Sequence, residues 1–195
     1  MQMYYIYSKN KKDLDTDMNE VTKCKIYDNI FLIGFMAVGK TSIGRNIANL
    51  LNVRFLDLDT EIQISEGKDI NAIFSDFGEA YFREKEKLAL HNSVGDMKKI
   101  IAVGGGVPCF QNNMEFMLSH GVVVFLEMNF ADIEGRLLKI KKNHRPLVNN
   151  YAKYDLKYLY DQRLSHYIKA HYTIQIGALD TIEDISNKVV IKIFQ

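Results

Sequence analysis

Residues 34–41 read Gly-Phe-Met-Ala-Val-Gly-Lys-Thr, with two glycines separated by four residues and followed by a lysine and a threonine. This spacing is typical of loops that bind nucleotide phosphates. Their backbone N–H groups and the positive end of the next helix bind the α- and β-phosphates, the lysine reaches the β- and γ-phosphates, and the hydroxyl group binds Mg²⁺. We therefore predict a site for a nucleotide and Mg²⁺. Its expected members are Gly34, Ala37, Val38, Gly39, Lys40, Thr41 and Ser42.

The residues around this loop favour a nucleotide site over a chance glycine-rich turn between a strand and a helix, which is the alternative interpretation. An apolar run precedes the loop, and residues 40–51 follow it with apolar side chains at helical spacing. Lys40 is expected to be catalytic and Thr41 to be a metal ligand. Ala37 stands where many such loops carry a further glycine, so its methyl group must fit close to the nucleotide.

Asp57 and Asp59 follow the next apolar run in the sequence Asp-Leu-Asp. Phosphoryl transfer needs metal ligation and a group that orients the attacking hydroxyl. Because side chains alternate along a strand, we expect both carboxylates to point to the same side and to share one pocket. Our hypothesis is that Asp57 holds Mg²⁺ through water and that Asp59 contacts the acceptor hydroxyl. The alternative is that the two carboxylates cap a helix.

Further motifs follow in a fixed order, namely Phe82-Arg83, Glu86, three consecutive glycines and Arg-Pro-Leu at residues 145–147. Together with the phosphate loop and the aspartate pair, they resemble the shikimate kinases, and the resemblance runs from about residue 30 to the C-terminus. It implies the P-loop kinase fold and an enzyme that transfers the γ-phosphoryl group of MgATP to the 3-hydroxyl of shikimate. The product would be shikimate 3-phosphate, an intermediate of aromatic amino-acid (chorismate) biosynthesis.

The same resemblance implies roles for individual residues. Arg83, braced by Glu86, and Arg163 would bind the carboxylate of shikimate. The three consecutive glycines would present backbone N–H groups to the shikimate molecule. The acceptor site as a whole would comprise Asp59, Phe74, Phe82, Arg83, Gly104, Gly105, Gly106 and Arg163. Arg145 would lie on a basic lid, reach the ATP phosphates and act in catalysis, and Arg136 would lie on the adenine side.

These motifs need elements that bring them together, and the chain alternates short β-rich runs with longer helical segments. The expected strands are 30–33, 54–58, 99–103, 122–126 and 172–176, and all five read as buried. The expected helices are 40–51, 79–94, 113–119, 130–140, 154–169 and 182–193. We predict an α/β fold with a five-stranded, mostly parallel sheet and helices on both faces. Gly34, Asp59 and Gly104 would then emerge at the carboxyl ends of strands, where ligands bind.

The chain of 195 residues suits one domain, which we place at residues 29–195, after an extension of unknown role at residues 1–28. Lysine and arginine number 25 against 24 aspartates and glutamates, so there is no general positive charge for nucleic acid. No apolar stretch approaches the roughly 20 residues that span a bilayer. The start has no apolar signal segment, and the two cysteines form no metal-binding pair. We expect a cytoplasmic monomer that acts on a small molecule, without nucleic acid or membrane.

Two other functions stay open from the residues alone. A related P-loop kinase could act on gluconate or a nucleoside monophosphate, and a nucleotide-binding module could have lost turnover. Arg83, Arg163 and the glycine run favour a hydroxylated carboxylic acid over a nucleobase. The presence of Lys40, Thr41, Asp59, Arg83 and Arg145 favours an enzyme over a binding module. The tyrosines at positions 151, 154, 158, 160 and 167 are interpreted as packing and surface residues, because no RNA-binding signature accompanies them.

Overall fold

The computed structural model describes residues 28–95, 97–141 and 153–195, in which five strands form one parallel sheet. The strands lie in the order β2-β3-β1-β4-β5, and every neighbouring pair is parallel. Their bounds are β1 (Asn29–Ile33), β2 (Arg54–Asp57), β3 (Lys99–Ala102), β4 (Gly121–Met128) and β5 (Tyr172–Ile176). The predicted α/β fold with a five-stranded sheet is confirmed.

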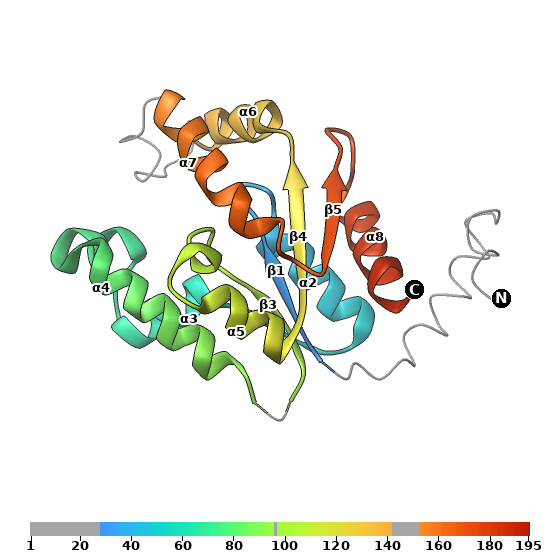
Figure 1. Cartoon of the computed structure of the whole chain (residues 1–195), viewed down its shortest axis with the longest axis horizontal. Coiled ribbons are helices and arrows are strands. Elements are labelled where there is room, and N and C mark those ends of the chain that lie inside the picture. The colour runs from blue at the N-terminus through green and yellow to red at the C-terminus, as the bar shows by residue number, and fades with distance from the viewer. Residues whose placement is uncertain (1–27, 96, 142–152) are drawn as a thin grey trace.

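Helices cover both faces of this sheet, as predicted (Figure 1). The helix after β1 and the last helix pack together on one side, and α5 packs on β4 from the other, while α3 and α4 lie beside the sheet. The helices are α2 (Lys40–Leu51), α3 (Leu58–Glu66), α4 (Ile70–Ser93), α5 (Asn113–His120), α6 (Phe130–Lys141), α7 (Lys153–Tyr167) and α8 (Ile182–Phe194), with a short 3₁₀ helix, η2 (Val107–Cys109).

The region between β2 and the middle of α4 differs from the prediction. The expected strand 54–58 ends at Asp57, because the Asp57 carboxylate accepts a hydrogen bond from the Asp59 N–H and caps α3. Helix α3 corresponds to the alternative in which the aspartates cap a helix, whereas the first turns of α4 were not predicted. Gly78 (φ 81°, ψ 174°) has non-helical angles inside α4, and the predicted helix begins only at the residue after it.

The strands at the edges of the sheet are less buried than the central strand. β1 is buried along its whole length, whereas the edge strands β2 and β5 are partly exposed, so the expectation that all five strands are buried is wrong for these two. The main core lies between the sheet and its helices. A second, smaller cluster of three buried residues, Ile62, Ile73 and Phe82, joins α3 to α4.

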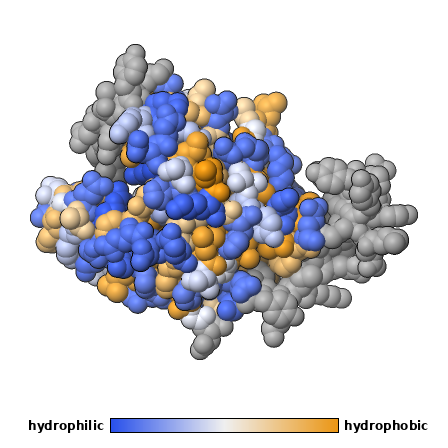
Figure 2. Space-filling model, viewed as in Figure 1, coloured by the Kyte–Doolittle hydropathy of each residue, from blue (hydrophilic) through white to orange (hydrophobic). Residues whose placement is uncertain are grey.

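Figure 2 shows that hydrophilic residues cover much of the face seen in Figure 1, with apolar residues between them in separate patches. Large exposed apolar side chains occur in several different elements, for example Ile64 in α3, Leu88 in α4 and Leu138 in α6. In the part of the chain that the structure describes, no helix has both the length and the apolar character needed to cross a membrane.

Strand register brings the predicted motifs to one edge of the sheet. Leu32 of β1 and Asp57 of β2 both align with Ala102 of β3. The phosphate loop, the aspartate pair and the glycine run each begin within two residues of these positions. Because the strands are parallel, all three segments leave the sheet side by side at its carboxyl edge.

Candidate active site

The phosphate loop connects β1 to α2 and lines a cleft. Ala37 and Gly39 have left-handed backbone angles, with φ values of 64° and 99°, and α2 begins directly after them at Lys40. An alanine adopts this conformation at a cost that a glycine avoids. The cleft has a volume of about 350 Å³. Its walls consist of Met36, Ala37, Gly39, Lys40, Thr41, Ser42, Asp57, Asp59, Ala102, Val103, Gly104 and Gly105.

Lys40 folds back over its own loop. Its Nζ donates to the carbonyl oxygens of Gly34 and Phe35, at 2.9 Å in each case. The hydroxyl residues Thr41 and Ser42 are exposed at the start of α2 and line the same cleft. The loop therefore presents a cation, two hydroxyl groups and the N-terminal end of a helix to one small space, which is an environment that attracts phosphate.

A second cation meets this loop from α6. Arg136 Nη1 donates to the carbonyl oxygens of Ala37 and Val38, at 3.4 Å in each case. The Val38 side chain is buried in the core, so only the backbone of this residue is available to a nucleotide. The structure thus brings Arg136 beside the loop, as expected for a residue on the nucleotide side.

The two aspartates lie close together, but strand alternation does not explain their positions. Thr41 Oγ1 donates to Asp57 Oδ2 at 2.6 Å, and the backbone N–H of Asp59 donates to Asp57 Oδ1 at 3.1 Å. Asp57 is the last residue of β2, whereas Asp59 lies in the first turn of α3. The expectation of one continuous strand is wrong, and the alternative of a helix cap is confirmed for Asp57. Both residues nevertheless line the cleft.

The oxygen atoms of Thr41 and Asp57 fit a magnesium ion, which prefers oxygen ligands and keeps several of its waters. Among residues 28–95, 97–141 and 153–195, no group of three histidine, cysteine or acidic side chains could hold a metal ion by itself. An ion at Thr41 and Asp57 would complete its coordination with waters and with phosphate oxygens of the nucleotide.

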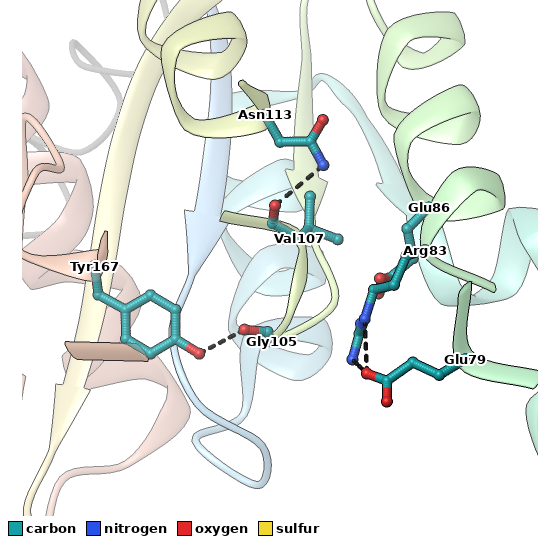
Figure 3. A network of polar contacts seen from close by, with 7 residues as sticks. All are labelled: Glu79, Arg83, Glu86, Gly105, Val107, Asn113 and Tyr167. Carbon is teal, nitrogen blue, oxygen red and sulfur yellow. Dashed lines mark hydrogen bonds and ion pairs between the residues drawn. The ribbon is translucent and has the colours of Figure 1, made fainter. Parts of the chain in front are cut away.

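Arg83 lies between two carboxylates of its own helix (Figure 3). Its Nε and Nη2 donate to Glu79 Oε1 at 3.1 and 2.8 Å, and its Nη1 donates to Glu86 Oε2 at 2.5 Å. Glu86 is only 2% exposed, and burial raises its pKa to about 7 although Arg83 acts in the opposite direction. Burial lowers the pKa of Arg83, but the two carboxylates raise it by more, so the guanidinium stays charged. Glu79 was not among the predicted site residues.

The glycine run fits closely against these charged groups. A methyl group at Gly104 would overlap Glu86 and would lie 3.0 Å from Asp59 Oδ1. A methyl group at Gly106 would overlap the guanidinium of Arg83. Only glycine allows the backbone to approach these side chains so closely, and Asp59, Glu86 and Arg83 are thereby gathered around one loop.

Arg163 reaches the same loop from α7. Its guanidinium lies over the ring of Phe35 at 5.7 Å, and its Nη1 would lie 3.2 Å from a methyl group at Gly105. Tyr167, four residues later on α7, donates from its hydroxyl to the Gly105 carbonyl at 2.6 Å. The sequence predicts only a packing role for Tyr167. The available signal was its spacing from Arg163, which places both side chains on the same helix face.

The remaining predicted residues either do not line the cleft or lie outside the described residues. Phe74 and Phe82 pack against each other with ring centroids 4.6 Å apart. Phe82 is 4% exposed and belongs to the small cluster between α3 and α4, so it supports Arg83 from within the protein. Arg145 and residues 142–147 of the expected basic lid lie outside the described residues, as do residues 1–27 of the extension.

Comparisons with known proteins show the family and the fold. A family model described as shikimate kinase matches residues 36–194. A shikimate kinase from Bacteroides thetaiotaomicron is 37% identical to this chain over 164 residues, which cover 82% of this chain and 93% of that protein. The similarity therefore extends over nearly all of the described elements and over nearly the whole relative.

Two solved structures have the same fold. The crystal structure of shikimate kinase from Bacteroides thetaiotaomicron has a TM-score of 0.76 and 34% identity, covering 86% of this chain and 99% of that one. Shikimate kinase from Acinetobacter baumannii in complex with shikimate has a TM-score of 0.76 and 31% identity, covering 91% of this chain and 97% of that one. Because the family model, the sequence identity and the fold all agree over most of its length, the chain belongs to the shikimate kinase family.

Proposed function

We propose that this chain transfers the γ-phosphoryl group of ATP to the 3-hydroxyl of shikimate, which yields ADP and shikimate 3-phosphate. The position of Asp59 carries this proposal. Asp59 lines the phosphate-loop cleft together with Gly104 and Gly105, and Gly104 also lies against Glu86, the partner of Arg83. A nucleotide in the cleft and a hydroxylated acid beside the arginines would therefore meet at the Asp59 carboxylate.

The nucleotide would bind to the backbone amides of residues 34–42, with Lys40 at its β- and γ-phosphates and Arg136 beside its base. Lys40 already sits over the loop, where its two carbonyl partners can be exchanged for phosphate oxygens. Mg²⁺ held by Thr41 and Asp57 would neutralise charge on the phosphates. The bond between Thr41 and Asp57 supports this assignment, because it brings two oxygen ligands together.

The acceptor would bind through its carboxylate to Arg83 and Arg163, and its ring would lie against the glycine run. A guanidinium offers a planar pair of donors that matches a carboxylate. Glu79 and Glu86 hold three N–H groups of Arg83 and so fix the plane of its guanidinium. Backbone N–H groups of the run can bind the acceptor closely because no side chain intervenes.

The chemistry would require little beyond positioning and charge. The 3-hydroxyl oxygen forms a bond to the γ-phosphorus, and the bond from that phosphorus to the oxygen bridging it to the β-phosphate breaks, so that ADP leaves. Asp59 orients the hydroxyl and accepts its proton. Lys40 and, from the lid, Arg145 offset the negative charge of the transferring group.

We further propose that the protein acts as a cytoplasmic monomer without nucleic acid or membrane partners. The balanced charge of +1 offers no general attraction for a polyanion. In the described part of the chain the large exposed apolar side chains are spread over several elements, and Cys109 is a free thiol, which suits a reducing compartment.

Release of ADP by the purified protein tests the proposal. With ATP and Mg²⁺ held constant, we expect release to depend on shikimate and not on gluconate or nucleoside monophosphates. Phosphorus NMR of the product should show a phosphate ester at the 3-position. The variant Asp59→Asn should lower kcat by at least about 100-fold, because proton transfer by a positioned group contributes that much. Its shikimate KM should change much less.

Asp161→Asn is a matched control for the charge change, since Asp161 is exposed on α7 and pairs with Lys157. ADP release that shikimate does not stimulate would favour the nucleotide-binding module, and stimulation by gluconate or a nucleotide would favour the related kinases. Near-normal turnover in Asp59→Asn would contradict the role of that carboxylate.

A further inference from the structure

Tyr167 is a buried residue that the mechanism above does not use. It is completely buried and is among the largest fully buried side chains of the described residues. Its ring packs on Phe125 of β4, with centroids 5.1 Å apart. Its hydroxyl donates to the Gly105 carbonyl at 2.6 Å, and this bond joins residues 62 positions apart in the sequence. A phenylalanine would provide the same packing, so the hydroxyl must be explained by its polar contacts with Gly105 and Arg163.

The other carbonyl groups of the glycine run accept bonds from close in the sequence. Val107 N–H donates to Gly104 at 3.1 Å, and Cys109 N–H donates to Gly106 at 3.0 Å. Those bonds shape η2 and the turn before it but do not attach the run to another element. Gly105 is bonded from α7 instead. Since a run of glycines has more conformational freedom to lose than any other sequence, an attachment at its centre has a large effect on its order.

The bond to Gly105 also sets the direction of a neighbouring donor. The described residues contain no cis peptide bond, so the C=O of Gly105 and the N–H of Gly106 point in opposite directions within one plane. Figure 3 shows Tyr167 and Arg83 on opposite sides of Gly105. A carbonyl held toward Tyr167 therefore directs the Gly106 N–H toward the side of the loop on which Arg83 lies.

Tyr167 also connects this loop to the second arginine. A methyl group at Gly105 would lie 3.2 Å from Arg163 Nη1 and 3.5 Å from the Tyr167 hydroxyl, so both groups meet the loop at the same residue. Burial raises the pKa of the Tyr167 hydroxyl, and the neighbouring Arg163 only partly opposes this, so the group stays protonated and able to donate.

We propose that Tyr167 is a positioning residue for acceptor binding. By holding the Gly105 carbonyl against α7, it fixes the glycine run, aims the Gly106 N–H toward Arg83, and keeps Arg163 in register with that N–H. The Tyr167 side chain is not itself a wall of the cleft and meets it only through the Gly105 carbonyl, so its effect should fall on binding of the acceptor.

The test is Tyr167→Phe, which removes only the hydroxyl. In rate measurements at saturating ATP, the shikimate KM should rise about 5- to 10-fold, which corresponds to the loss of one hydrogen bond. The value of kcat should stay within about threefold and the ATP KM should be unchanged, because the bond acts on acceptor binding in ground and transition states alike.

Tyr160→Phe is the matched control. Tyr160 is also buried on α7, and its hydroxyl donates to a backbone carbonyl, that of Met128, at 3.3 Å. The control loses a comparable bond away from the glycine run, so it should lose stability without a change in the shikimate KM. Equal shikimate KM values in the two variants would overturn the proposal.

Amide hydrogen exchange of the unliganded proteins provides a second measurement that needs no activity. In Tyr167→Phe the peptide containing residues 104–107 should exchange faster, while peptides from β1 and α2 should be unchanged; Tyr160→Phe should leave the loop as in the wild type. An unchanged loop would overturn the proposal. The shikimate KM rests on the proposed function, but a wild type that failed to phosphorylate shikimate would defeat that function and leave the exchange test intact.

Discussion

The phosphate loop takes its groups from one continuous segment, residues 34–42, whereas the acceptor cluster collects side chains from α3, α4, α7 and the run after β3. The first half of the site relies mainly on backbone groups of one loop, with Lys40, Thr41 and Arg136 as the side chains that meet it. The second half depends on ion pairs such as that between Arg83 and Glu86, which must be brought together by the whole fold. A site of the first kind should be insensitive to most single side chains and to pH. A site of the second kind should be sensitive to both.

Lys40→Met removes the cation of the phosphate loop, and it should have the largest effect. We expect kcat to fall by about 1,000-fold, because the lysine offsets charge that grows in the transition state. The shikimate KM should stay within about threefold, since Lys40 belongs to the nucleotide half.

Lys188→Met is the control for this change, since Lys188 pairs with Asp180 near the start of α8 and lies outside the cleft. It should retain full activity. A Lys40→Met enzyme with more than about one tenth of the normal kcat would remove the distinction between the loop's lysine and its other side chains.

Arg83→Lys separates the charge of the acceptor cluster from its geometry. A lysine keeps the positive charge but cannot bind Glu79, Glu86 and a carboxylate with one rigid plane. Calorimetric titration should show shikimate binding weakened by about 10- to 100-fold and ATP binding unchanged. Arg45→Lys, on α2 beside the ring of Phe55, is a matched control. Equal losses for both ligands would mean that the two halves are not independent.

The pH dependence of the unfolding free energy tests the charged groups of the acceptor half. Burial raises the pKa of Glu86 from 4.5 to about 7, so the folded protein holds this proton more tightly than the unfolded chain. The resulting stabilisation is complete below pH 4.5 and is lost as pH rises through about 7. Relative to Glu86→Gln, the wild type should lose up to about 3 kcal/mol over this interval and then show no further change.

Urea denaturation at a series of pH values measures this difference. Glu115→Gln, at an exposed position of α5, provides the comparison for loss of an ordinary carboxyl group. A wild type that became more stable than Glu86→Gln as pH rose through this interval would show that Arg83 outweighs burial at Glu86.

Ala37→Gly should have the smallest effect. It tests whether the backbone conformation of the loop controls nucleotide binding. Glycine adopts the φ of 64° without strain and removes a methyl group from the wall of the cleft. The ATP KM should fall by about two- to fivefold. Asn52→Gly relieves a similar backbone angle, a φ of 51° at the end of α2, and should leave the ATP KM unchanged. A higher ATP KM in Ala37→Gly would mean that the methyl group is useful.

The parts of the fold that depend on local pattern could be predicted from the sequence. Strand β5 and helix α2 have the predicted bounds, because apolar periodicity and the glycines around them are local signals. Helix α3 entered the prediction only through the alternative in which the two aspartates cap a helix, because the apolar run before it suggests a strand one residue longer than β2. The non-helical angles of Gly78 likewise divide a helix that otherwise continues from residue 70.

The candidate site shows the same division. The phosphate loop is recognisable from its spacing alone, and Arg83 and Glu86 came from the resemblance to a family. Glu79 and Tyr167 each lie four residues from an arginine of the site, and Tyr167 ends the Arg-x-x-x-Tyr stretch that the resemblance includes, but their contacts with Arg83 and the Gly105 carbonyl appear only in the fold. The roles assigned to the site residues stay predictions that the experiments above decide.

Ile62, Ile73 and Phe82 form an apolar cluster that is separate from the main core, and Phe82 is the neighbour of Arg83 in sequence. A segment with its own small core can open without the rest of the molecule. On gradual warming, the acceptor site should therefore lose its structure while the phosphate loop is still folded. Heat inactivation would then begin as a loss of substrate discrimination and only later become a loss of folding.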